Sequence, residues 1–419
     1  MVEATVELAG RAASFIKSRP HDFKVVVVRQ GLQQFLYQLT YPYQSIYTVA
    51  LGASPVELGL VNSVGMGVGA AVSPFTGWLV DKYGVKGIYL IGLVLLALSP
   101  LIYAVAHMWT IVIIGMVLYW LGVRVSGTAC SVVCASSLTN EDRATSMNLC
   151  NMFGSSLVIA SPMLGAVLVT WFGGVNAEGI RPLFYIAFVG GVLLLGFAAW
   201  QLSSARRGMP EGGNILAGIS EVFRHGHFLK RWIVISAMMW LPWAMITPFT
   251  QVYAHEVKGA EQYVLGGMVT GMAVASLVMG VPVGRLADKI GRKKVLYLLA
   301  PLFYGSSVSL ILAPNFYFLI LSGVLSGFYM VSMVVSGAMG YELVPGEYLG
   351  RWVGVLGLFR GLISVPAPLL GGLIWDAIGP QYVFLTAIGL DLCIRIPLLV
   401  GMPETLGGRF NVEPTAQDK

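Results

Sequence analysis

Charged side chains are scarce in this sequence. Asp, Glu, Lys and Arg make up only 11% of the 419 residues, whereas 56% are hydrophobic, and the mean hydropathy is +0.76. Soluble globular domains carry about 25% charged residues, so this composition excludes an ordinary soluble domain. Apolar runs of about 20 residues, the length that a helix needs to cross a bilayer, recur along nearly the whole chain. The composition therefore predicts an all-α, polytopic membrane protein.

Signatures of enzymes and metalloproteins are absent too. The sequence has no Walker-type GKS or GKT loop for ATP, no nucleophile elbow, and no histidine cluster with metal-ligand spacing among its 5 histidines. Its 4 cysteines, Cys130, Cys134, Cys150 and Cys393, fall in predicted helices, where packing is the usual role of a thiol. Cys130 and Cys134 lie one turn apart and leave a soft-metal pair as the rarer alternative. We predict no enzyme activity, no cofactor and no metal site.

The basic residues are distributed unevenly about twelve helices predicted from the apolar runs. Those helices span residues 30–50, 57–76, 87–106, 109–136, 146–172, 183–203, 231–254, 263–283, 295–313, 316–341, 353–375 and 381–402. On this map 21 of the 26 Lys and Arg lie on the side of the N-terminus, 2 (Arg181 and Lys258) on the other side, and 3 inside helices. This asymmetry follows the positive-inside rule.

That distribution also indicates where the protein resides. We expect a multi-pass protein of the plasma membrane with both termini in the cytoplasm, and the first thirty residues lack the clean apolar core of a cleavable signal peptide. The basic charge is explained by topology and by contact with anionic lipid. No nucleic acid partner is therefore expected.

The second half of the chain repeats the first. A shift of 206 residues aligns identical residues in five pairs: His21 with His227, Lys24 with Lys230, Pro42 with Pro248, Tyr47 with Tyr253, and Pro162 with Pro368. A shift of 207 residues aligns Asp81 with Asp288, the acidic residues of a repeated loop. Parallel six-helix repeats are a known transporter architecture. We predict a lead at 1–23, a first six-helix bundle at 24–203, a cytoplasmic linker at 204–230, a second bundle at 231–402 and a tail at 403–419.

One loop motif occurs in both halves, as GWLVDKYGVKG at 77–87 and GRLADKIGRKK at 284–294. Each copy combines a helix-ending Gly, one Asp, a second Gly and basic residues, which suits a tight cytoplasmic turn. The motif resembles the signature loop of the major facilitator superfamily (MFS) of secondary transporters. The second copy matches at almost every position, whereas the first departs at Trp78 and Val85.

The resemblance covers nearly the whole chain through helix count, repeat, charge sidedness and the doubled loop. It implies the MFS fold, in which twelve transmembrane helices form two pseudo-twofold-related six-helix bundles. It also implies an inner gate that holds the bundles together, formed by Gly77, Asp81, Gly84, Lys86, Gly284, Asp288, Gly291 and Arg292. The alternative is that both loops are only tight turns. If the gate is unequal, it should depend more on Asp288 and Arg292 than on Asp81 and Lys86.

Candidate substrate-binding residues follow a polar stripe on the first helix. Gln and Tyr recur there at spacings of three and four, a pattern that lipid would not tolerate. The 206-residue shift relates Gln34 and Tyr37 to two tryptophans on the seventh helix. The candidates are Gln33, Gln34, Tyr37, Tyr41, Arg124, Asn148, Asn151, Trp240 and Trp243. They suit a partly apolar organic solute with a few hydrogen-bonding groups, bound near the midplane; anchoring of the aromatics at the membrane interface is the alternative.

Few charges lie inside helices, and these are candidates for ion coupling. The segment YWLGVRVSG, which contains Arg124, resembles a helix-four pattern that is associated with coupling in proton-coupled exporters of the superfamily. Arg stays protonated, so Arg124 would bind an anion or act on a neighbouring carboxylate, or it is structural. The carboxylate candidates are Glu57, Glu342 and Asp391. For Asp391 and Arg395, one turn apart, a structural ion pair is favoured over a proton relay.

These observations predict a monomeric secondary active transporter that works by alternating access. SPMLGA at 161–166 and APLLGG at 367–372 partly resemble an element of exporters, so we expect proton-coupled export of amphipathic organic compounds, of the drug:proton antiporter type. Uptake of a polar metabolite such as a sugar or an organic acid is the alternative. Minor alternatives are a non-transporting receptor and transport of a soft metal, which methionines such as Met268 and Met272 suggest. The expected partners are a small molecule, protons and the lipid bilayer.

Overall fold

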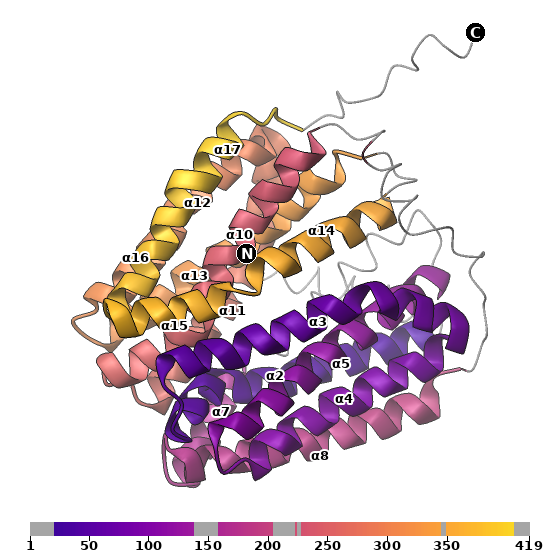
Figure 1. Ribbon diagram of the computed structural model, residues 1–419, viewed down its shortest axis with the longest axis vertical. Helices are drawn as coiled ribbons and strands as arrows, with labels where there is room; N and C mark the ends of the chain where they lie inside the picture. The colour runs from indigo at the N-terminus through magenta and orange to yellow at the C-terminus, as the bar shows by residue number, and fades with distance from the viewer. Residues whose placement is uncertain (1–20, 138–157, 204–222, 224–227, 345–348, 406–419) are drawn as a thin grey trace. The chain divides into compact units, whose positions relative to one another are not determined.

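The computed structural model describes residues 21–137, 158–203, 223, 228–344 and 349–405 (Figure 1). Within that part of the chain the regular structure is helical. The elements are α2 (His21–Ala50), α3 (Pro55–Tyr83), α4 (Val85–Val105), α5 (Trp109–Ser137), α7 (Ser161–Trp171), α8 (Ala177–Gln201), α10 (Leu229–Val252), η1 (Tyr253–Val257), α11 (Gln262–Ile290), α12 (Arg292–Leu312), α13 (Phe316–Tyr341), α14 (Leu349–Ser364), α15 (Ala367–Ala377), α16 (Pro380–Leu390), η3 (Asp391–Arg395) and α17 (Ile396–Val400).

Each of the twelve predicted ranges overlaps a helix in the part of the chain that the structure describes, which confirms the all-α class. The helix ends differ from the prediction, however. α2 begins at His21 and not at residue 30, and α11 ends at Ile290 and not at residue 283. Backbone hydrogen bonds continue a helix beyond its apolar run, so hydropathy underestimates length where the flanking turns are polar.

Ten of the described helical segments are long and apolar enough to cross a membrane. α2 is not one of them, although it has 30 residues. Its Gln residues, together with Arg29, lower its hydropathy below that of a lipid-facing span. The helix that carries the candidate stripe is therefore the one whose composition suits lipid least.

The described chain divides into two compact units. Unit 1 contains residues 21–53, 64–203 and 261–266, and unit 2 contains 54–63, 228–260 and most of the chain from 267 to 405. In unit 1, α4 packs against α5 and α8, while α2 packs against α5, α7 and α8. In unit 2, α10 packs against α14, α15 and α16, and α12 against α13 and α16. The core of unit 1 includes Phe23, Tyr89, Leu93, Leu96, Val125 and Ala198.

Close helix contacts repeat between the two units in the register found in the sequence. A Cβ added at Gly165 of α7 would lie 2.5 Å from the carbonyl oxygen of Leu39 on α2. A Cβ added at Gly371 of α15 would lie 2.9 Å from the carbonyl oxygen of Met245 on α10. Both residues of the second pair follow those of the first by 206 positions. In each unit, a glycine therefore lets the same two helices of the repeat approach closely.

Polar contacts repeat as well, with a shift of 207 residues. The hydroxyl of Ser99 donates to the Gly115 carbonyl at 2.8 Å, and that of Ser306 donates to the Ser322 carbonyl at 2.9 Å. The first bond joins α4 to α5, and the second joins α12 to α13. The third and fourth helices of each repeat are thus fastened at the same place.

The last helix of each repeat follows a shift of 200 residues. Lys86 donates to the Leu202 carbonyl at 2.5 Å, and Lys293 donates to the Met402 carbonyl at 2.7 Å. Tyr47 packs on Phe184 with ring centroids 5.0 Å apart, and Tyr253 packs on Phe384 at 5.2 Å. These matched contacts align α8 with the segment from α16 to α17, in which each counterpart lies 200 positions later in the sequence.

Candidate functional site

The polar stripe of α2 meets aromatic side chains of α5 in unit 1. Tyr37 stacks on Tyr119 with ring centroids 5.0 Å apart and planes inclined by 11°. The Tyr41 ring lies 5.5 Å from Tyr37, and the Trp120 ring lies 5.8 Å from Tyr119. We call Tyr37, Tyr41, Tyr119 and Trp120 the unit 1 aromatic cluster. Its rings are partly buried, and so are Gln33 and Gln34 on the same helix.

Arg124 extends this cluster with a positive charge. Its guanidinium carbon lies 5.9 Å from the centre of the Trp120 ring, within the range of a cation–π contact, and the side chain is partly buried. Trp120 precedes Arg124 by one helical turn on α5. The cluster and Arg124 together combine flat apolar faces, phenol hydroxyls and one fixed cation.

In unit 2, the two candidate tryptophans of α10 have different surroundings. Trp240 is 38% exposed. Trp243 stacks on Tyr329 of α13, with ring centroids 5.4 Å apart and planes inclined by 17°. Tyr329 is fully buried, and its hydroxyl donates to the carbonyl of Met239 on α10. One tyrosine thus holds both the ring and the backbone of the segment that carries Trp243.

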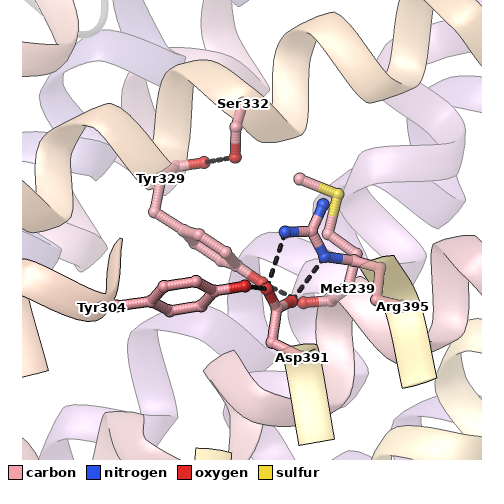
Figure 2. Close-up of polar contacts among 6 residues, drawn as sticks. All are labelled: Met239, Tyr304, Tyr329, Ser332, Asp391 and Arg395. Carbon is pink, nitrogen blue, oxygen red and sulfur yellow. Dashed lines mark hydrogen bonds and ion pairs between the residues drawn. The ribbon is translucent and has the colours of Figure 1, made fainter. Parts of the chain in front are cut away.

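Asp391 and Arg395 form the ion pair predicted from their spacing, and η3 is the element that carries both (Figure 2). Asp391 is 0% exposed and Arg395 2% exposed. Arg395 Nη2 donates to Asp391 Oδ2 at 2.7 Å, and Nε donates to Oδ1. The Tyr304 hydroxyl donates to Oδ2 at 2.6 Å. The carboxylate therefore accepts three hydrogen bonds, all from side chains of unit 2.

The other two carboxylate candidates are engaged elsewhere. Glu57 lies in the first turn of α3, where its carboxylate accepts from the Ser54 backbone N–H at 2.7 Å and its own N–H donates to the Ser54 hydroxyl at 3.3 Å. This reciprocal pair is a capping box. Glu342, at the end of α13, pairs with Arg292 at 2.7 Å and accepts from the Thr405 hydroxyl at 2.6 Å. The three carboxylates lie on different elements, and no described contact joins them.

The doubled loop is shorter than the sequence suggested. α11 continues through Gly284 to Ile290, and α12 begins at Arg292, so only Gly291 separates them. The prediction that Gly284 ends a helix is therefore wrong, and the turn is made by Gly291, whose φ of 110° favours glycine. Gly84, with a φ of 85°, separates α3 from α4 in the same way. The helix through Gly77 likewise continues to Tyr83.

Two carboxylates hold the second copy of the loop. Glu404 accepts from the backbone N–H groups of Arg292 at 2.9 Å and Lys293 at 3.1 Å, and thus caps the N-terminus of α12. Glu342 binds the Arg292 side chain. Asp288, 69% exposed, lies 3.7 Å from the same guanidinium. Arg292 is therefore shared between an exposed and a partly buried carboxylate.

The sequence profile that defines the Major Facilitator Superfamily matches residues 30–278 and 261–404. The chain belongs to the Major Facilitator Superfamily. The match covers both repeats and both copies of the loop, so the MFS fold expected from the doubled motif is confirmed, as is a multi-pass membrane protein of the transporter class.

Other members resemble this MFS protein over most of their length. Multidrug resistance protein MdtG of Escherichia coli O9:H4 (strain HS) is 23% identical over 377 residues, which cover 85% of this chain and 88% of MdtG. The crystal structure of the nucleoside transporter NupG superposes with a TM-score of 0.70 at 14% identity, covering 92% of this chain and 100% of NupG. The D-xylose-proton symporter gives a TM-score of 0.74 at 13% identity, covering 92% and 99%.

Sequence reasoning missed several residues of this MFS protein that the structure brings to the candidate site. Tyr119 and Trp120 were not singled out, although Trp120 lies one turn before Arg124 on the same helix face. Tyr304 and Tyr329 had no signal in the sequence, because their partners lie 87 and 90 residues away. Asn148 and Asn151 lie outside the described residues, and so does the side chain of Asp81.

Arg29 is a further difference between the expected and the observed charges. The count of basic residues placed it in the segment before the first helix, but it lies within α2 and is only 1% exposed. Its guanidinium carbon lies 5.2 Å from the centre of the Tyr89 ring, and Nη2 donates to the side chain of Gln30. Asp22, Lys24 and Arg29 interrupt the apolar residues at the start of α2, so the predicted helix began one residue after Arg29.

Proposed function

We propose that this MFS transporter exports amphipathic organic compounds in exchange for protons. The observation that carries the proposal is the unit 1 aromatic cluster with Arg124 at its end. Stacked rings bind flat apolar bodies without demanding one shape, and the hydroxyls of Tyr37 and Tyr41 supply hydrogen bonds. The name of the curated relative, a multidrug resistance protein, supports export over uptake.

The charges favour a substrate with a neutral or negatively charged head group. Asp391 is the carboxylate that lies deep within a described span, and Arg395 already neutralises it. Arg124 places a positive charge beside the aromatic cluster. The guanidinium would repel a cationic compound at close range, whereas an anionic head group that reached it would gain a charge-assisted hydrogen bond.

We assign proton coupling to Glu342 in preference to Glu57 or Asp391. Glu57 caps its own helix, and Asp391 is fully buried and already engaged by Arg395 and Tyr304. Glu342 has a side chain that is 28% exposed, so water reaches it, and it binds Arg292 of the doubled loop. Protonation of Glu342 would weaken that ion pair. A proton would thus act directly on the second copy of the loop, around Asp288, Gly291 and Arg292.

The test is transport by the purified protein in proteoliposomes under an imposed pH gradient. A panel would contain aromatic amphipaths in neutral, anionic and cationic forms of matched size. We expect movement of neutral and anionic compounds toward the acidic side, at a rate that falls when the gradient is removed. Gradient-driven accumulation of a sugar or an organic acid alone would instead favour uptake, with Gln33 and Gln34 as the specificity residues. If the protein moved neither the aromatic amphipaths nor a sugar or an organic acid, transport of these classes would be overturned.

A further inference from the structure

Unit 2 contains a buried polar cluster to which the proposed transport mechanism assigns no part. We define it as Tyr304, Tyr329, Asp391 and Arg395, contributed by α12, α13 and η3 (Figure 2). Figure 2 shows both tyrosine rings pointing toward the Asp391 carboxylate. η3 is a π-helical turn, and such turns in transmembrane and soluble helices occur frequently at functional sites.

The fold itself does not require this cluster, because the other repeat does without it. The registers of 200 and 207 residues relate Asp391 to Gly191 and Tyr304 to Ala97. In unit 1 these positions pack directly, since a Cβ added at Gly191 would lie 3.2 Å from the Ala97 Cα. Two small residues thus join the helices in unit 1 where unit 2 has a charged pair and a phenol. The polar cluster is therefore specific to unit 2.

The contacts of the cluster lead to Trp243. Asp391 binds the Tyr304 hydroxyl, and the neighbouring Phe303 packs on Tyr329 with ring centroids 4.4 Å apart. Tyr329 in turn stacks on Trp243. Each contact joins residues of unit 2, so the path does not depend on how the units are arranged.

The segment of α10 that contacts Tyr329 contains a proline, so it lacks one backbone hydrogen bond of the helix. Pro242 immediately precedes Trp243, and proline supplies no backbone N–H to the helix. The hydroxyl of Tyr329 donates to the Met239 carbonyl one turn before Trp243. Tyr329 therefore fixes the backbone beside the proline as well as the face of the indole.

We propose that the buried polar cluster is a positioning unit that sets the orientation of Trp243 and thereby the affinity for the solute. The second half of this statement rests on the proposed function, whereas the first half concerns the indole alone. Asp391 and Arg395 are positioning residues, because neither contacts Trp243 in the described contacts and Tyr304, Phe303 and Tyr329 connect them to it. The ion pair supplies rigidity, because Arg395 donates two hydrogen bonds to Asp391 while Asp391 is also held by the Tyr304 hydroxyl.

Two variants test the proposal without relying on a single fragile substitution. The first replaces the cluster with its counterparts from unit 1, as Asp391→Gly, Arg395→Leu and Tyr304→Ala in one protein. The second, Tyr329→Phe, removes only the hydroxyl that binds Met239. Ser306→Ala is the matched control, because it removes a buried hydroxyl bonded between α12 and α13 that does not contact Trp243.

The readouts are KM and maximal rate of transport, and the emission of Trp243, taken as the difference from the same protein carrying Trp243→Phe. We expect both variants to shift the emission and to raise KM about fivefold, with little change in maximal rate; Ser306→Ala should change neither. Unchanged Trp243 emission in both variants would overturn the proposal, and so would an altered pH dependence without a change in KM. An emission shift in a protein that moves no solute even without substitution would retain the positioning and overturn the proposed function.

Discussion

At the scale of single residues, we propose that Arg124 decides what kind of solute the unit 1 aromatic cluster holds. Stacking on Tyr37 and Trp120 selects flat apolar bodies but does not distinguish charges. The guanidinium does, because it stays protonated at any physiological pH. Arg124 is partly buried beside Trp120, where the attraction of a charged head group is stronger than in bulk water.

Arg124→Gln should therefore separate anionic from neutral substrates. We expect KM for an anionic amphipath to rise about tenfold, the equivalent of about 1.4 kcal/mol, because a charge-assisted hydrogen bond is lost. KM for a neutral compound with the same aromatic body should change less than about twofold, since the stacking remains. Paired transport assays of the two compounds in one preparation supply the control. Equal effects on both would show that Arg124 supports the fold and does not read charge.

Asp288 is 69% exposed and lies 3.7 Å from Arg292, so this ion pair contributes little to stability and Asp288 is a clean probe of gating. Exposed pairs stabilise proteins by about 0–1 kcal/mol. Asp288→Asn should leave the melting temperature unchanged but slow the transport cycle, while solute binding is retained. Asp376→Asn, another exposed carboxylate at a helix end, is the matched control. A turnover equal to that of the unsubstituted protein would reduce the loop to a simple turn.

At the scale of elements, the repeat is a set of matched helix contacts. Gly165 and Gly371 occupy equivalent positions and let α7 approach α2 and α15 approach α10. The polar cluster around Asp391 is an exception to this equivalence. The two repeats thus share the same helix contacts, and unit 2 in addition stacks Trp243 on Tyr329.

Larger side chains at these two glycines should be equally harmful. We expect Gly165→Val and Gly371→Val each to lower the stability by about 1–3 kcal/mol, because the added atoms would overlap a backbone carbonyl. Gly196→Val is the control, since the space around that glycine is open. Thermal unfolding in detergent measures all three. A large effect at one glycine and none at the other would contradict the matched packing of the two repeats.

The sequence predicted the elements much better than the side-chain partners. The helices, the repeat and the MFS fold could be predicted from the apolar runs and the doubled loop, because these features depend on local composition. The ion pair of Asp391 was predicted because its partner lies one turn away. Glu404 and Tyr329 were not predicted, because each acts on a residue that only tertiary folding brings near. The start of α2 was misplaced because Asp22, Lys24 and Arg29 flank the apolar residues of its first two turns.

At the scale of the whole molecule, the chain is an MFS transporter in which charged side chains are scarce. Asp391, deep within a described span, is paired with Arg395. Glu342, at the end of α13, is partly exposed and contacts Arg292 and Thr405. Coupling through Glu342 would let a proton control the doubled loop directly, with no relay through the interior of unit 2.

The most direct test of proton-coupled export measures solute and protons together. Proteoliposomes would be loaded with an anionic amphipath and a pH-sensitive dye, and diluted into medium without the compound. We predict that efflux of the compound lowers the internal pH, and that Glu342→Gln abolishes this acidification while the protein still binds the compound. Efflux with no change in internal pH would contradict the account.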